Sequence, residues 1–143
     1  MRVLVTITAA LALSASLGLS QEAATKIKKV PTTYTNPTSG VEMYRNYCAA
    51  CHGLDGKGSG PAAAALKKAP ADLTGLAKKN GGKFPTLEVQ QYIKGESITD
   101  AHGSRDMPMW GDLFRSIGAG NPEMVVTLRV KNLTEYLAGM QVK

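Results

Sequence analysis

The chain has 143 residues and a formal net charge of +6 at neutral pH. Hydrophobic residues make up 43% of it and charged residues 20%, a balance typical of one folded domain. This composition excludes a coiled coil, a collagen-like fibre and a multidomain enzyme, and the presence of a single apolar run excludes a polytopic membrane protein. Aromatic residues make up only 6%, which is few for a domain that fills its core with side chains alone.

Residues 1–20 are predicted to be a secretory signal peptide. An apolar run over residues 3–19 follows Arg2, and the small residues Gly18 and Ser20 precede a cleavage site before Gln21. The alternative is an uncleaved membrane anchor, because a run of this length lies at the lower limit for a spanning helix. We therefore expect an exported protein, periplasmic if its source is bacterial, that touches a membrane only if the signal is retained.

Residues 21–39 are polar and interrupted by prolines, which predicts an extended N-terminal arm, and residues 40–143 form the predicted domain. From Gly40 onward, apolar residues return every three or four positions, as on one face of a helix. These residues are Val41, Tyr44, Tyr47 and Cys48. Four glycines within residues 53–60 then end the helical pattern.

The middle of the chain predicts a short helix after Pro61, a polar turn around Pro70 and one longer helix. Thr86 is the expected N-cap of that longer helix, and Gly95 is its expected end. Its apolar residues are Leu87, Val89, Tyr92 and Ile93. Residues 96–120 show no sustained periodicity and are predicted to be rich in loops.

A last helix is predicted from the pair Asn121 and Pro122, which is typical of an N-cap followed by the first helical residue. Its apolar residues recur at alternating intervals of four and three, which buries one face. They are Val126, Val130, Leu133, Leu137 and Met140. Because no strand pattern competes, the predicted fold class is all-α, with three to five helices and long loops.

The two cysteines form the sequence Cys48-Ala49-Ala50-Cys51, and His52 follows directly. On a helix, thiols three positions apart share one face and the next residue projects beside them. This spacing is that of covalent c-type haem attachment. We predict one haem c per chain, bonded to Cys48 and Cys51, with His52 as an axial ligand of the iron. A porphyrin at the centre of the core also accounts for the low aromatic content.

Three other interpretations of the cysteine pair have weaker support. A redox-active pair is expected after a strand in a βαβ unit, which the pattern lacks. A zinc site needs four ligands and would use every cysteine and histidine of the chain: Cys48, Cys51, His52 and His102. A structural disulfide across two residues closes too small a loop to stabilise the fold much.

Three stretches together resemble a known family. They are GVEMY at 40–44 with CAACHG at 48–53, DGKGSGP at 55–61, and MPMWG at 107–111. With them, residues 40–141 resemble a small monohaem class I cytochrome c. The resemblance implies a cytochrome c-like all-α fold whose long loops wrap around one covalent haem.

The resemblance also implies the remaining contacts of the haem. It places the backbone carbonyl of Pro61 at Nδ1 of the proximal His52, and it makes Met107, the first methionine of the Met-Pro-x-Trp pattern, the sixth ligand. Met109 is the main alternative, and His102 would give bis-His ligation. Met43 and Met140 are expected to pack in the core. Met124, at the start of the last helix, is a weaker candidate for the iron ligand.

Two further sets of residues have expected roles. Arg105 and Trp110 lie in the same loop as Met107 and are candidates to hydrogen-bond the haem propionates, with surface and packing roles as the alternatives. The resemblance implies the second set. Gly40 would admit an aromatic ring where the first and last helices cross. The crossing would involve Tyr44, Tyr136 and Leu137.

The expected function is one-electron transfer between exported or membrane-bound redox partners. With both axial positions filled by protein, the iron cycles between Fe(II) and Fe(III) without binding a substrate. We expect no enzyme activity, because no separate acid–base constellation is found. The alternative is a haem enzyme or sensor, such as a peroxidase or gas-binding protein, whose sixth ligand is labile.

The expected partners are redox proteins that bind transiently and are acidic at the docking face. The lysines are scattered over the chain and give it a basic surface. Interfaces of electron carriers are small, which allows rapid dissociation. No nucleic-acid partner is expected, because the chain has no run of five or more basic residues.

Overall fold

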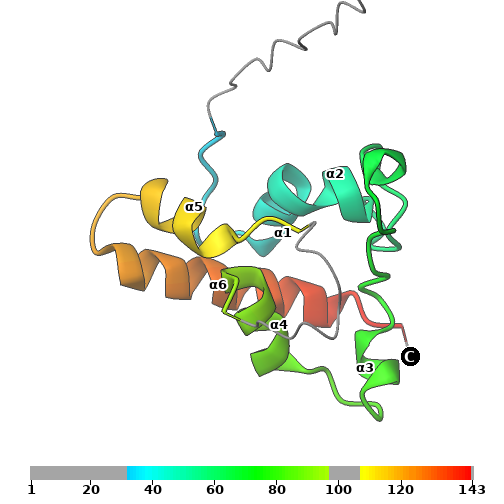
Figure 1. The fold of residues 1–143 in the computed structure, drawn as a ribbon. Coiled ribbons are helices and arrows are strands. Elements are labelled where there is room, and N and C mark those ends of the chain that lie inside the picture. Colours follow the sequence, from blue (N-terminus) through cyan, green and yellow to red (C-terminus); the bar gives the residue numbers. More distant parts are fainter. Residues whose placement is uncertain (1–31, 97–106, 143) are drawn as a thin grey trace, which may run out of the picture. The chain divides into compact units, whose positions relative to one another are not determined.

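The computed structural model describes residues 32–96 and 107–142. The predicted signal peptide at 1–20 and the first part of the arm lie outside these residues. In the two described ranges the chain is helical and contains no strand (Figure 1). The elements in chain order are α1 (Gly40–Met43), η1 (Tyr44–Cys48), α2 (Ala49–His52), η2 (Ala63–Ala65), α3 (Leu76–Lys79), α4 (Thr86–Lys94), α5 (Trp110–Ser116) and α6 (Pro122–Gly139).

The first three elements follow one another without a break, and we call residues 40–52 the motif helix. Counted with α3, α4, α5 and α6, it gives five helices in the described part of the chain, besides the 3-10 turn η2. This confirms the predicted all-α, cytochrome c-like fold. The middle of the motif helix, η1, is a π-helix, and the N–H of Ala49 donates to the carbonyl of Tyr44 five residues back.

The prediction for Val41 was wrong, because this side chain is 38% exposed. Tyr44 and Tyr47 are buried as predicted, and Met43 is buried with them. Gly40 determines this orientation. A Cβ added there would clash with the backbone oxygen of Asn132 and lie 2.7 Å from Cβ of Tyr136.

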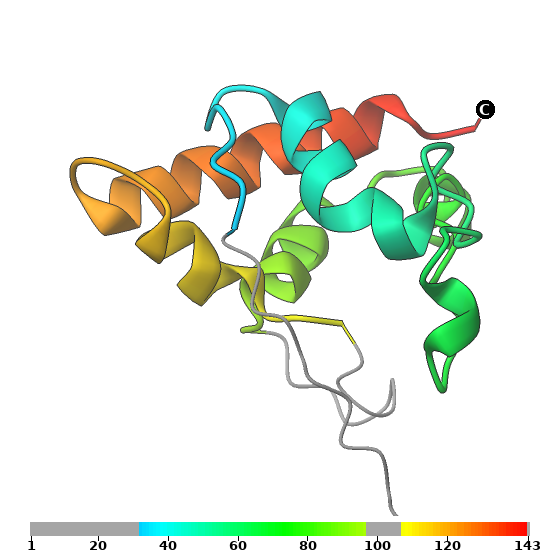
Figure 2. The same cartoon turned by 90° about the horizontal axis from the view of Figure 1, so that it is seen from above.

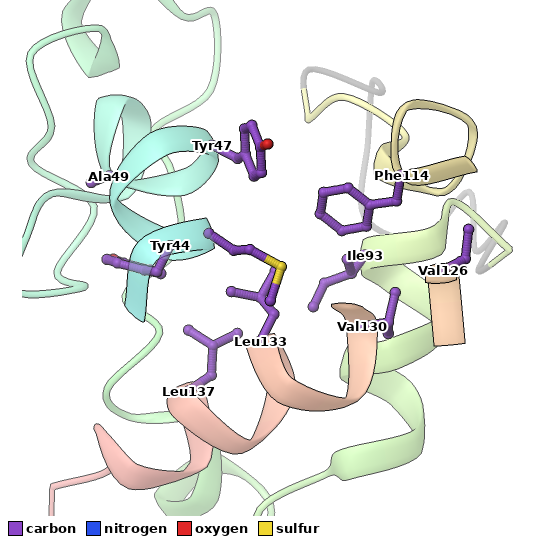
Figure 3. Packing of buried hydrophobic residues seen from close by; sticks show 10 residues of the cluster. Tyr44, Tyr47, Ala49, Ile93, Phe114, Val126, Val130, Leu133 and Leu137 are labelled. Atoms are coloured by element: carbon purple, nitrogen blue, oxygen red, sulfur yellow. The ribbon is translucent and has the colours of Figure 1, made fainter. Parts of the chain in front are cut away.

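The close approach at Gly40 confirms the expected crossing of the first and last helices. The rings of Tyr44 and Tyr136 lie 5.3 Å apart at this crossing. Leu137, also expected there, is buried. Figure 3 shows Leu133 and Leu137 extending from α6 towards the motif helix, which carries Tyr44 and Tyr47.

Helix α6 begins as its local sequence predicts. The side chain of Asn121 accepts hydrogen bonds from the backbone N–H groups of Glu123 at 3.0 Å and Met124 at 3.2 Å, and Pro122 is the first helical residue. In Figure 2, α6 runs the length of the folded unit, and it packs against α1, α4 and α5. The predicted stripe is buried at Val126, Val130, Leu133 and Leu137, and Met140 is half-buried.

The start of α4 differs from the prediction. Thr86 is the first helical residue rather than the N-cap, because the N–H of Val89 bonds to the carbonyl of Pro85 at 3.0 Å and the helix therefore starts one position earlier. The predicted end is confirmed, since Gly95 takes a left-handed conformation with φ of 83°. Helix α5 lies in the segment 96–120 that is predicted to be rich in loops, and the short helix α3 is not predicted by the sequence.

The core is built mainly from the motif helix, α5 and α6, with Ile93 of α4 (Figure 3). Thr35 of the N-terminal arm is fully buried as well, so packing begins before the predicted domain boundary at residue 40. Among the described residues, no helix is long and apolar enough to cross a membrane.

Candidate haem-binding site

The Cys-x-x-Cys-His sequence lies at the end of the motif helix. Cys48 is the last residue of η1, and Cys51 and His52 are in the single turn of α2. All three side chains are half-buried, and the two cysteines are free thiols. The three-residue spacing places both sulfurs on the same side of the helix, one turn apart.

The environment of the Cys48 thiol favours its neutral form. The pKa of Cys48 is raised to about 12, mainly by burial of the thiol and to a smaller extent by the neighbouring Cys51. The thioether that forms when such a thiol adds to a vinyl group is also neutral, so the bond puts no charge into a half-buried position. Two unpaired thiols on one helix face, with a histidine beside them, therefore fit the two covalent bonds and the axial ligand of a c-type haem.

The ring of His52 is oriented by a backbone carbonyl, as expected, but the residue differs from the prediction. Nδ1 lies 3.0 Å from the carbonyl oxygen of Ala71, not from that of Pro61. Pro61 is exposed. The loop around it bonds back onto the motif helix through Gly58 and Gly60, whose N–H groups donate to backbone carbonyls of α2 at 2.8 and 3.0 Å. With Nδ1 engaged in this way, Nε2 is the nitrogen that remains for a metal.

Glycines allow the loop after the motif to lie against α2. A Cβ on Gly60 would clash with the carbonyl oxygens of Ala49 and Ala50. The chain also turns sharply at Gly53, where φ is 79°. The hydroxyl of Tyr44 donates to the carbonyl of Gly53 at 2.7 Å and ties this turn to the first turn of η1.

The segment with the predicted sixth ligand lies directly before α5. Met107 is half-buried, whereas the side chain of Met109 is 46% exposed. The thioether of Met109 lies against Gly95, because a Cβ added to Gly95 would be 3.0 Å from its Sδ. His102 and Arg105 lie outside the described residues. The assignment of Met107 as the iron ligand therefore stays a prediction.

The other methionines lie where the sequence placed them. Met43 is fully buried in the core, and Met140 is half-buried against it. Met124 is 72% exposed near the start of α6. The packing roles predicted for Met43 and Met140 are thus confirmed.

An aromatic cluster joins the motif helix to the segment of Met107. The ring of Tyr47 lies 5.5 Å from that of Trp110 and 5.6 Å from that of Phe114. Tyr47 directly precedes Cys48, so the cluster connects the two parts of the chain that are predicted to bind the iron from opposite sides. The proposed contact of Trp110 with a haem propionate stays a prediction.

A polar network behind this cluster was not predicted from the sequence. The hydroxyl of Tyr47 lies 3.0 Å from Oγ1 of Thr35, which accepts a hydrogen bond from the buried guanidinium of Arg129 at 2.8 Å. One signal was available, because Arg129 follows Val126 by three residues and adjoins Val130 in the apolar stripe of α6. A charged residue at such a position is placed on the buried face by the periodicity itself.

Comparison with known families identifies a match that includes these segments. Residues 35–117 match the family model described as Cytochrome C oxidase, cbb3-type, subunit III. The match covers more than half of the chain, and it contains both the Cys-x-x-Cys-His sequence and the segment of Met107. No curated protein and no solved structure gives a significant match.

Proposed function

The chain belongs to the family of cbb3-type cytochrome c oxidase subunit III, and from that premise we propose that it is a one-electron carrier in which Met107 completes the iron coordination begun by His52. It is a c-type haem electron-transfer protein, with haem c bound covalently at its Cys-x-x-Cys-His sequence. When bound, the haem supplies one-electron chemistry between Fe(II) and Fe(III). Cys48 and Cys51 hold it through thioethers, and His52 binds through Nε2.

The observation that supports a carrier best is the contact between the motif helix and the methionine segment. Trp110, which directly follows Met109, packs 5.5 Å from Tyr47, which directly precedes Cys48. This contact holds a thioether-bearing segment close to the helix that carries the proximal histidine. A protein ligand on each side of the iron leaves no position for a substrate, which is the requirement for a carrier rather than a haem enzyme.

The distribution of charge supports acidic redox partners. Between residues 57 and 83 the chain carries six lysines and only one acidic residue, Asp72. All of these lysines are exposed: Lys57, Lys67, Lys68, Lys78, Lys79 and Lys83. We call them the loop lysines; they lie between α2 and α4 (Figure 1). Such a positive surface steers an acidic partner into a weak, rapidly exchanging complex, in the exported compartment that the predicted signal implies.

Spectra of the purified, haem-loaded protein test the proposal. A pyridine haemochrome assay reports covalent haem, and a weak band at the red end of the oxidised spectrum reports a methionine–Fe(III) bond. We expect both signals from the wild-type chain. High-spin features in the oxidised spectrum would instead show an open sixth position and favour the peroxidase or gas-binding alternative.

The family description favours a second candidate function, which is that of a subunit held permanently in an oxidase complex. A carrier dissociates from its partners at ordinary ionic strength, whereas a subunit remains with them. Mild detergent extraction of native membranes followed by size separation distinguishes the two. Haem c that elutes at the size of the free chain supports the carrier.

A further inference from the structure

Arg129 of α6 carries a fully buried positive charge. Its guanidinium donates to Oγ1 and the carbonyl oxygen of Thr35, both at 2.8 Å, and to the carbonyl oxygen of Ile117 at 3.2 Å. It also lies 5.4 Å from the ring centroid of Tyr34 and 5.8 Å from that of Phe114. All of these partners are neutral. Arg129 takes part in none of the ion pairs found within residues 32–96 and 107–142.

This charge is permanent, because an arginine side chain does not lose its proton in a protein. The neutral oxygens around it satisfy most of its N–H groups, but Nε has no hydrogen-bond partner. Removing a cation from water without a counter-ion is unfavourable for folding. A neutral hydrogen-bond donor at this position would hold Thr35 of the N-terminal arm without the desolvation free energy of a buried cation. Holding the arm therefore does not explain the charge.

The position of the charge connects it to the haem-binding segments. Oγ1 of Thr35 lies 3.0 Å from the hydroxyl of Tyr47, the residue directly before Cys48. The ring of Tyr47 contacts Trp110, which directly follows the segment 107–109. Arg129 thus contacts the aromatic cluster directly at Phe114 and reaches Tyr47 through the hydrogen-bonded Thr35. This cluster joins both predicted sides of the iron site.

We infer that the buried charge of Arg129 raises the reduction potential of the haem. The inference rests on the proposed function as a Met-ligated carrier. Oxidation leaves one additional positive charge at the iron, and a fixed cation in the low-dielectric interior disfavours that state. The exposed lysines exert less influence, because water and salt screen them.

Substitutions on α6 separate the charge of Arg129 from its structural role. Arg129→Met removes the charge and should lower the reduction potential. Arg129→Lys keeps the charge but loses the forked hydrogen bonds, and its potential should stay closer to that of the wild type. Lys131→Gln is the matched control, because it removes a cation whose side chain is 57% exposed two residues further along the same helix. We expect it to leave the potential unchanged.

Two outcomes of this series would overturn the inference. Equal potentials for Arg129→Met and the wild type would show that the charge has no influence. An equally large fall in Arg129→Met and Arg129→Lys would show that packing or water entry, not charge, is responsible. In every variant, the methionine–Fe(III) band is recorded together with the potential. Its absence from the wild type would contradict the proposed function, whereas its presence with unchanged potentials would contradict only the role of Arg129.

A second pair of variants leaves Arg129 in place, in case its replacement prevents folding. Thr35→Asp introduces a carboxylate where Oγ1 now accepts from the guanidinium, and so neutralises the buried charge. Thr35→Asn introduces a side chain of the same shape without charge. We expect a lower reduction potential for the aspartate variant than for the asparagine variant. Equal potentials for the two would refute the inference independently of the first series.

Discussion

Two methionines flank Pro108 in the segment before α5, and a single sixth position can accept only one of them. Met109 packs its thioether on Gly95 and is partly exposed, whereas Met107 is half-buried. We predict that Met107→Ala abolishes the methionine–Fe(III) band, lowers the reduction potential and opens the iron to small ligands, because a soft thioether stabilises Fe(II). Oxidised spectra and redox titrations measure these effects.

Met109→Ala is the matched control for that experiment and should leave the band in place. A band lost in Met109→Ala and kept in Met107→Ala would reverse the assignment and leave the carrier function intact. A band kept in both variants would place the ligand elsewhere in the chain. His102→Ala should leave the oxidised spectrum unchanged. A changed spectrum in this variant would indicate bis-His ligation.

The hydroxyl of Tyr44 gives the second prediction for a single residue. The side chain is fully buried, donates to the carbonyl of Gly53 at 2.7 Å, and has its pKa raised by burial from 10.0 to about 12. Between these values the unfolded chain loses this proton while the folded chain keeps it. The contribution of Tyr44 to the free energy of unfolding is therefore constant well below pH 10 and falls as the pH rises from about 10 to about 12.

Tyr44→Phe removes this pH dependence and one buried hydrogen bond. Denaturant unfolding on either side of the interval measures both effects. The variant should be less stable by about 1 kcal/mol at neutral pH, from the lost hydrogen bond. The difference in stability between wild type and variant should then shrink at alkaline pH. A constant difference over the whole range would show that Tyr44 titrates alike in both states.

At the scale of helices, the crossing of the motif helix and α6 depends on one glycine. A Cβ on Gly40 would clash with the backbone oxygen of Asn132, and a backbone atom moves only with its helix. We predict that Gly40→Ala lowers the free energy of unfolding by about 1–3 kcal/mol, the usual cost of overpacking. Thermal or denaturant unfolding of the haem-loaded protein checks this.

Gly139→Ala is the matched control, since a Cβ at this last residue of α6 meets nothing within 4 Å. It should be neutral, or stabilising by up to about 1 kcal/mol through helix propensity. Unchanged or increased stability in Gly40→Ala would show that the crossing accommodates a methyl group and that helix propensity dominates at this position.

The helices that could be predicted are those with strong local signals. Asn121 and Pro122 begin α6 as expected, because capping involves only adjacent residues. Gly95 ends α4 for the same reason. Helix α5 was missed because it is short, and its burial depends on contacts of Phe114 with Tyr47 in a distant part of the sequence.

In the candidate site, too, the features that depend on adjacent residues could be predicted, and those that depend on distant residues could not. The positions of Cys48, Cys51 and His52 on one helix followed from their spacing alone. The carbonyl that orients His52 did not, because Ala71 is 19 residues away and its contribution is a backbone atom that any residue carries. The periodicity of α6 indicates that Arg129 is buried, but its partner Thr35 lies 94 residues away and could not be predicted from local patterns.

At the scale of the whole molecule, the positive charge is unevenly distributed along the chain. The loop lysines are opposed by one acidic residue between positions 57 and 83. Helices α5 and α6, by contrast, carry three basic and three acidic residues, and the acidic ones form ion pairs such as Arg115 with Asp112 and Lys131 with Glu135. Long-range attraction for an acidic partner should therefore come from the loop lysines rather than from α6.

We predict that electron transfer to an acidic redox partner slows as salt is added, and that the loop lysines cause this dependence. The screening length is about 10 Å at 0.1 M ionic strength, so steering of the partner should fade over that range.

The double variant Lys78→Gln and Lys79→Gln, in α3, should react more slowly than the wild type at low salt and equally fast at high salt. Lys131→Gln removes one positive charge from the balanced surface of α6 and should follow the wild-type curve. Stopped-flow measurement of the second-order rate constant at several ionic strengths gives all three curves. A rate constant independent of salt, or an equal effect of the α3 and α6 variants, would show that these lysines act in solubility and not in docking.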